Sequence, residues 1–392
     1  MRDYFMKHSP IRFADFIDGD CVNSRDGRLT ADGLVLSLAV EAPAGHTVTL
    51  NGAPMREDAD GRYRAEVLLR GYRNTVLAED LTDGTSCRIA LYHLAKTVGR
   101  YRLSSDDNIL FLQDLTEHSE RYPSIFDHPY LAVYKKAHDL YGAKVHLNLF
   151  YELCEEGRSC FRARPNYFNL SMMTEKYKDE FRANADWLKL AFHSRAEFPA
   201  NPSALGDAAT VTADCIAVLR EIVRFAGAEC ISDSTTVHFG SGNHDVVRAL
   251  RALGFRSLTG YFTLNSKGEP SVSYYCPKDL VQHFDIRDFW VDTEEDMLYG
   301  RIDKVLNLDS LEQVKADVRD AIEHPHRGGF VSVMIHEQYF YADYKRHLPD
   351  FEERVLSACR DLHEHGYIGA HITEVTAEPH LRDFPAFREY TA

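Results

Sequence analysis

The spacing of apolar residues changes near residue 100. Before that point, short apolar segments, several of them alternating with polar residues, occur at 34–40, 47–50, 63–69, 75–78 and 87–92. Turn signals such as Asn51-Gly52 and Asp83-Gly84 separate them. Short strands with a turn about every 8–12 residues are typical of a small β-sandwich. We therefore expect residues 1–100 to form a β-sandwich domain with an N-terminal extension.

After residue 100 the pattern predicts strands alternating with helices. The predicted strands cover 109–112, 144–151, 188–192, 236–239 and 330–335, and the predicted helices cover 131–140, 174–187, 211–226, 244–253, 310–322 and 350–365. This alternation indicates a parallel sheet with crossover helices, and its length favours a β/α barrel over an open sheet. The expected fold is thus multi-domain, with a β-sandwich at 1–100 followed by a distorted (β/α)7-type barrel at 101–392.

Composition and charge narrow the class of protein. The chain has 392 residues and a net charge of −15, which argues against nucleic acid or an anionic membrane as the main partner. The first residues lack an apolar stretch of signal-peptide length, and apolar runs stay far below the ~18 residues of a membrane span. The eight cysteines are scattered without a C-x-x-C pair, which indicates reduced, structural thiols. We expect a soluble, cytoplasmic protein.

Polar residues that follow predicted strands are the candidates for chemistry, because the carboxyl ends of barrel strands surround the active site. Three such strand ends carry Gln113-Asp114, His193 with Glu197, and His336-Glu337. One imidazole and two carboxylates can hold zinc, manganese or a similar divalent ion. We expect Asp114, His193 and Glu197 to be the ligands. Taken singly, an Asp or His after a strand can also be a turn cap or a hydrogen-bonded loop residue.

These strand ends and the order of elements over residues 105–375 resemble the polysaccharide deacetylases. That family consists of metal-dependent carbohydrate esterases with a distorted seven-stranded β/α barrel. Its first motif is a strand ending in two adjacent aspartates, a catalytic base and then a metal ligand; here Gln113 and Asp114 take these places. Its second motif is His, then Ser or Thr, with another His four residues after the first; His193-Ser194 matches and Glu197 replaces the second His.

The remaining motifs are kept to different degrees. The third motif, an Arg-x-Pro stretch, is missing from residues 237–243, which occupy its place. Trp290, flanked by acidic residues, echoes the fourth motif, and the apolar strand ending at His336 matches the fifth, whose His is the general acid. The short strands and turns of residues 1–100 loosely resemble the immunoglobulin-like domains that accompany many carbohydrate-active enzymes.

The departures bear on catalysis. Gln113 cannot accept a proton, so it can only orient water or substrate, and His336, Glu337 or Glu117 would have to act as the base. A ligand set of Asp, His and Glu is harder than one with two His, which shifts the metal preference towards manganese or magnesium-like ions, with zinc still compatible.

Aromatic and polar residues suggest the substrate. Tyr339 and Tyr341 follow His336 and suit a sugar ring, although they could instead pack a loop against the barrel rim. Trp290 and His238 are further candidates for substrate contact, and the glycine-rich turn at 240–242 reads as structural rather than as a phosphate cradle.

These features lead to one main hypothesis and two alternatives. The main one is a hydrolase in which metal-activated water removes an acyl group, N-acetyl first among the candidates, from a small-molecule or oligosaccharide substrate. The alternatives are a carbohydrate-binding protein that lost the catalytic base, and a metal-dependent hydrolase of another C–N or glycosidic bond. A homo-oligomer is compatible with each.

Overall fold

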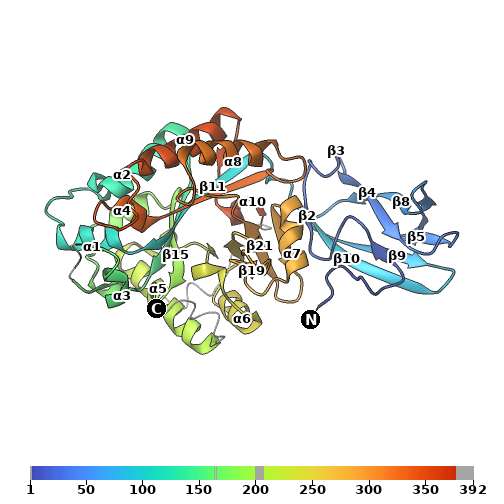
Figure 1. Cartoon of the computed structure of the whole chain (residues 1–392), viewed down its shortest axis with the longest axis horizontal. Coiled ribbons are helices and arrows are strands. Elements are labelled where there is room, and N and C mark those ends of the chain that lie inside the picture. The colour runs from blue at the N-terminus through green and yellow to red at the C-terminus, as the bar shows by residue number, and fades with distance from the viewer. Residues whose placement is uncertain (1, 163, 165, 199–206, 377–392) are drawn as a thin grey trace.

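The computed structural model describes residues 2–162, 164, 166–198 and 207–376. Figure 1 shows a β-rich N-terminal part beside a larger part that contains the helices. None of the helices in the described ranges is long and apolar enough to cross a membrane.

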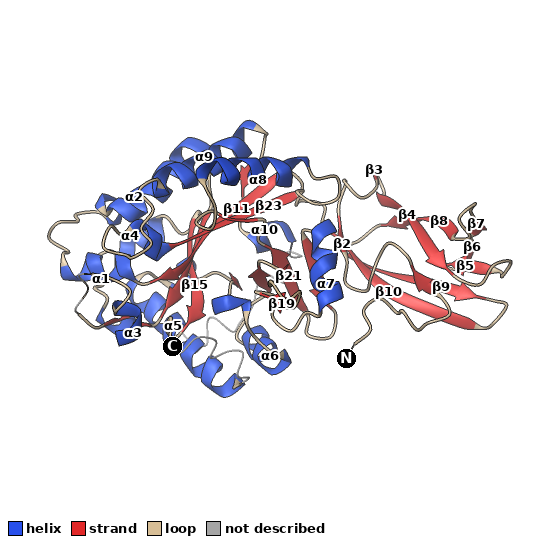
Figure 2. Cartoon of the chain, in the orientation of Figure 1, coloured by secondary structure: helices blue, strands red, loops and turns tan. Residues whose placement is uncertain are grey.

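The N-terminal part consists of two five-stranded sheets (Figure 2). The first contains β1 (Arg12–Phe13), β3 (Arg28–Thr30), β4 (Gly33–Glu41), β7 (Arg56–Glu57) and β8 (Tyr63–Leu69). The second contains β2 (Cys21–Val22), β5 (Val48–Leu50), β6 (Ala53–Pro54), β9 (Arg73–Asp80) and β10 (Thr85–His93). Alternate residues of β4 and of β9 and β10, such as Leu36, Val76 and Ile89, are buried in one hydrophobic core. The two sheets therefore share a core, while the resemblance to immunoglobulin-like domains stays a prediction.

The larger part is a mixed α/β structure with two further sheets. The six-stranded sheet runs β15 (Leu188–Ser194), β12 (Val145–Phe150), β11 (Arg100–Asn108), β23 (Phe330–His336) and β22 (Lys304–Val305), all parallel, with β24 (Ile368–Gly369) also paired to β11. The four-stranded sheet runs β16 (Ser234–Thr235), β17 (Ser257–Gly260), β21 (Met297–Arg301) and β20 (Phe289–Asp292). Over the described residues these pairings form two sheets and not a closed ring, so the parallel strands fit a barrel-like core that is not closed by strand pairing.

Helices cover the outside of these sheets. Helices α2 (Pro129–Tyr141), α9 (Phe351–Glu364) and α8 (Leu311–Glu323) lie side by side along one edge of the molecule in Figure 1, and α5 (Ala208–Phe225) packs on β15. The other helices are α1 (Leu110–Glu117), α3 (Glu155–Arg158), α4 (Lys178–Ala183), α6 (His244–Ala252), α7 (Lys278–His283) and α10 (Ile372–Thr376). Local signals set several ends: Pro129 is the first residue of α2, Gly142 ends it with φ of 64°, and the Ser310 side chain caps α8.

Most predicted elements of this part are confirmed, but two of the strands are not. The apolar segment 109–112 is not a strand: β11 ends at Asn108 and α1 begins at Leu110. Most residues of β11 are polar, yet eight of its nine residues are buried, so its sequence does not look like a core strand. At 236–239 the strand is also wrong, since β16 ends at Thr235 and a 3-10 turn covers His238–Gly240. The helix expected at 174–187 is shorter, at Lys178–Ala183.

Apolar residues join the N-terminal sheets to the α/β part. Cys21, Ala90 and Tyr92 pack with Phe289 and Val291 of β20 in one buried cluster. The indole of the neighbouring Trp290 donates to the carbonyl oxygen of Asp18 at 2.8 Å.

Candidate metal centre and its cleft

Two adjacent aspartates, Asp106 and Asp107, stand at the carboxyl end of β11. In a regular strand, neighbouring side chains point to opposite faces. Here the pairing of β11 with β12 shifts register between Ser105 and Asn108, and Asp107 has a φ of 62°. Such a bulge redirects side chains. As a result, both carboxylates line the same cleft.

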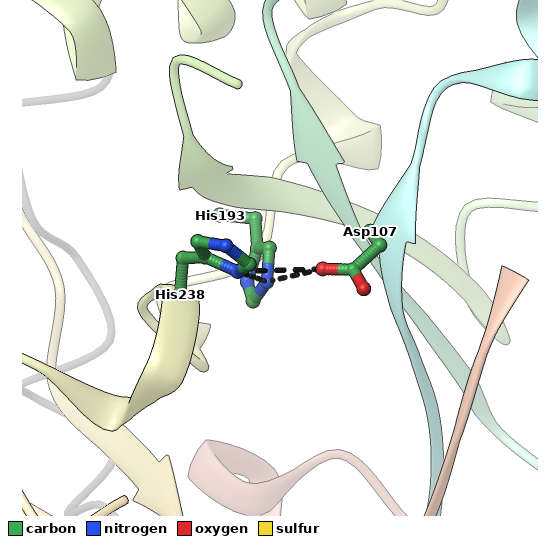
Figure 3. Close-up of side chains that lie close together, drawn as sticks. All are labelled: Asp107, His193 and His238. Carbon is green, nitrogen blue, oxygen red and sulfur yellow. Dashed lines mark hydrogen bonds and ion pairs between the residues drawn. The ribbon is translucent and has the colours of Figure 1, made fainter. Parts of the chain in front are cut away.

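Asp107 lies with two histidines in a buried cluster of potential metal ligands (Figure 3). His193 comes from the end of β15 and His238 from the turn after β16. Asp107 Oδ1 is 3.0 Å from His193 Nε2 and 3.4 Å from His238 Nδ1, and these two nitrogens are 3.2 Å apart.

The spacing of these three atoms fits a tetrahedral divalent ion. Ligand bonds of about 2.0–2.1 Å at tetrahedral angles place ligand atoms roughly 3.3 Å apart. The observed separations of 3.0, 3.2 and 3.4 Å are close to this value. One carboxylate and two imidazoles are also a donor set that suits zinc and other first-row ions. The residues present therefore fit a metal, and three protein ligands leave a position for a further group.

Neighbouring groups hold these ligands in place. The Nδ1 of His193 donates to the carbonyl oxygen of Thr236, which fixes the ring with Nε2 towards the cluster. Gln338 Nε2 donates to Asp107 Oδ2 at 2.7 Å and leaves Oδ1 facing the histidines. Burial disfavours the charged carboxylate of Asp107, but His336, His193 and His238 outweigh this effect and hold its pKa well below the ordinary value.

A cleft of about 340 Å³ opens over the cluster. Asp106 lies in it, and its Oδ1 accepts a hydrogen bond from Asn148 Nδ2 at 2.6 Å. His336, at the end of β23, donates from Nδ1 to Asn307 Oδ1 at 2.8 Å, so its Nε2 faces Asp107 Oδ2 at 4.0 Å. Further lining residues are Phe239, Tyr339, Tyr344 and Arg346. The cleft thus brings a second carboxylate and a third imidazole to the centre.

The structure does not bring the expected Asp114 to His193. Because 109–112 starts a helix, Gln113 and Asp114 lie on α1. Asp114 pairs with Arg164 at 3.1 Å and with His128 at 3.4 Å, and Gln113 donates to Glu117 at 2.9 Å. Both belong to a hydrogen-bonded network of the helix, and Asp107 takes the place expected for Asp114.

Glu197 lies in the cleft but outside the ligand cluster. His238 occupies the ligand position that was expected for Glu197. Burial, followed by the nearby charge of Asp107, raises the pKa of Glu197 to about 8.

The other expected site residues divide between the cleft and the core. His336, Tyr339 and His238 line the cleft. Glu337 is fully buried instead, and its carboxylate accepts hydrogen bonds from the amides of Ile109, Leu110 and Phe111 at the start of α1, while Tyr341 OH donates to it at 3.1 Å. Trp290 lies at the junction with the N-terminal part. Glu337, Tyr341 and Trp290 are thus placed as structural groups.

Sequence reasoning missed Asp106 and Asp107, and it missed the ligand position of His238. The adjacent aspartates followed by Asn108 are a signal in the sequence, but the apolar segment just after them predicts the strand instead. His238 carries no spacing signal, because it reaches the centre from a separate turn 45 residues after His193.

Comparisons with known proteins relate the chain only loosely to others. No protein-family model and no curated protein sequence matches it. One similar solved structure is BA3943, a CE4 family pseudoenzyme from Bacillus anthracis, at 12% identity and a TM-score of 0.36, covering 72% of this chain and 67% of that one. A BA3943 mutant with restored enzymatic activity also matches, at 12% identity and a TM-score of 0.36, covering 83% of this chain and 92% of that one. Because these identities and TM-scores are low, any conclusion about function must rest on the residues of the cleft.

Proposed function

We propose that the chain is a divalent-metal-dependent hydrolase that removes an acyl group from a sugar or sugar-like substrate. The observation that carries this proposal is the pair Asp106-Asp107 at the end of β11, with Asp107 beside two histidines. Two adjacent aspartates at a strand end, and a His at the end of a later strand, are what the resemblance to polysaccharide deacetylases requires. Both features occur here. The aspartates are Asp106 and Asp107 rather than the expected pair Gln113-Asp114, and the histidine is His336, as expected.

Five residues of the cleft have a role in this chemistry. Asp107, His193 and His238 would hold the ion, which supplies a Lewis acid and lowers the pKa of water. Asp106, oriented by Asn148, accepts a proton from the attacking water as general base. His336, oriented by Asn307, donates a proton from Nε2 to the leaving nitrogen or oxygen.

The aromatic and polar lining of the cleft supports a sugar as the substrate. Tyr339, Tyr344 and Phe239 offer aromatic faces, and Arg346 offers hydrogen-bond donors. Apolar ring faces and hydroxyl groups of a sugar suit such a mixed surface. The non-catalytic alternative depended on Gln113 in the position of the base, and with Asp106 there the hydrolase is the better-supported proposal.

The test is to reconstitute the protein with zinc or manganese and to measure acid release from N-acylated and O-acylated sugars. We expect Asp106→Asn to keep the metal and to lower the rate by about 10²–10⁴-fold, the usual contribution of a general base. A metal-loaded protein that releases no acid from any acylated sugar would refute the hydrolase.

A further inference from the structure

A small apolar pocket opens beside Asp107. Its wall comes from the start of α1, the end of β12 and the segment around α3, and it is formed mainly by Ile109, Leu110, Phe150, Leu153 and Phe161. It encloses about 40 Å³, whereas one water molecule needs roughly 10–15 Å³, so it has room for about three carbon-sized groups. An apolar hollow next to a charged ligand cluster is suited to a substrate group and not to bulk water.

The pocket and the wide cleft meet at the metal centre. Asp107, Glu197, Gln338 and Tyr344 line both, whereas His336 lines the cleft alone. Hydrolysis forms a bond from the water oxygen to the acyl carbon and breaks the bond from that carbon to the sugar nitrogen or oxygen, which leaves with a proton from His336. The leaving sugar must therefore lie in the cleft beside His336, and the rest of the acyl group must point elsewhere.

We propose that the apolar pocket beside Asp107 receives the acyl chain, and that the preferred substrate carries a short-chain acyl group such as butyryl rather than acetyl. This inference rests on the proposed hydrolase function and names its substrate class. Acetyl supplies only one methyl group, which leaves most of the pocket unfilled. A butyryl chain supplies three carbons beyond the carbonyl, which matches the available room.

The expected preference follows from the apolar surface removed from water. Burying one methylene group corresponds to about a fourfold change in an equilibrium or rate ratio, so two more methylenes should raise kcat/KM by about 15-fold. Chains longer than the pocket, such as octanoyl, should show no further gain over butyryl, because the extra carbons extend beyond the pocket.

Gly157 offers a way to fill the pocket. It lines the pocket from α3, and a Cβ there would lie 3.4 Å from Leu153 Cδ1 and 3.6 Å from Cys154 Sγ, which are ordinary contacts. A Cβ at position 157 is therefore accommodated, and we expect the further carbons of Gly157→Leu to take up pocket volume. The matched control is Tyr339→Leu, because Tyr339 lines the cleft and does not line the pocket.

The experiment measures kcat/KM of the zinc-reconstituted protein for glucosamine carrying acetyl, propionyl, butyryl or octanoyl groups. We expect butyryl to exceed acetyl by about 15-fold in the wild type and in Tyr339→Leu, and by less than threefold in Gly157→Leu, with acetyl hydrolysis retained. Equal rates for acetyl and butyryl, or a Gly157→Leu variant that loses all substrates equally, would overturn the pocket and leave the hydrolase standing.

Binding separates the two proposals if turnover is absent. Failure to hydrolyse any acylated sugar refutes the hydrolase, but the pocket still predicts that the zinc-loaded protein binds butyrate about 15-fold more tightly than acetate, and that Gly157→Leu removes the difference. Titration calorimetry with both acids measures this ratio, and equal affinities would refute the pocket.

Discussion

Replacing His238 by Gln removes one of the three ligand atoms of the proposed centre. His238 Nδ1 lies 3.2 Å from His193 Nε2 and 3.4 Å from Asp107 Oδ1, so it forms one corner of the ligand triangle. Four-ligand structural zinc sites contribute about 10–16 kcal/mol, which is roughly 3–4 kcal/mol per ligand. Loss of one ligand should therefore weaken zinc binding by about 10²–10³-fold.

The assay is competition for zinc against a chromophoric chelator of known affinity, at a fixed pH. Wild type, His238→Gln, Asp107→Asn and Asp114→Asn form the series. Asp114 is bonded to Arg164 and His128 on α1, so Asp114→Asn should lower thermal stability and leave zinc affinity within about threefold of wild type. The reasoning fails if Asp114→Asn loses the metal and His238→Gln keeps it.

Three further predictions concern the support of the site and the fold. Gln338→Leu removes the hydrogen bond to Asp107 Oδ2 and should weaken zinc binding by about 10–100-fold in the same competition assay; unchanged affinity would mean that Gln338 does not orient the ligand. Trp290→Ala should lower the free energy of unfolding by about 3–5 kcal/mol in denaturant titrations and leave KM of the folded protein unchanged, whereas a raised KM at full stability would return Trp290 to the substrate site. Burial, with the nearby charge of Asp303, raises the pKa of Asp288 to about 7, so the folded protein holds this proton more tightly than the unfolded chain. The stabilisation from this proton is thus complete below about pH 4 and falls by about 4 kcal/mol as the pH rises to about 7. Asp288→Asn should remove the part of that decline that lies between pH 5 and pH 8, measured by denaturing the metal-free protein at both pH values. Free energies of unfolding that fall equally with pH in the variant and in the wild type would contradict the assignment.

The sequence predicts those elements in which an apolar pattern marks the strand or helix and a polar residue marks its end. The strands that end at His193 and His336 are apolar runs followed by a polar residue, and both histidines reach the cleft. The helices at 131–140 and 350–365 carry apolar residues at helical spacing and coincide with α2 and α9.

The strand β11, which carries Asp106 and Asp107, does not follow this apolar pattern. In β11 the buried positions include Arg102, Ser104 and Ser105, because the interior beneath the cleft is polar. A hydrophobicity pattern cannot identify such a strand, and the apolar residues that follow belong to a helix whose start is held by the buried carboxylate of Glu337. The sequence pattern therefore predicts the base and the ligand at Gln113 and Asp114, seven residues after the two aspartates that line the cleft.

The third ligand could not be predicted from spacing. His238 reaches the centre because of how the short strand β16 is held. This strand pairs in parallel with β17, and the hydroxyl group of its residue Thr235 donates to the carbonyl oxygen of Phe192 in β15. Only the folded arrangement brings that turn next to His193.

The most direct test of the proposed function is hydrolysis in water enriched in ¹⁸O. Zinc-reconstituted protein is incubated with N-butyrylglucosamine and N-acetylglucosamine, and the products are analysed by mass spectrometry. The hydrolase predicts that the released acid carries one ¹⁸O atom from water, and that Asp106→Asn with bound zinc lowers the rate of release by about 10²–10⁴-fold. Intact substrate, or release that does not depend on Asp106, would contradict it.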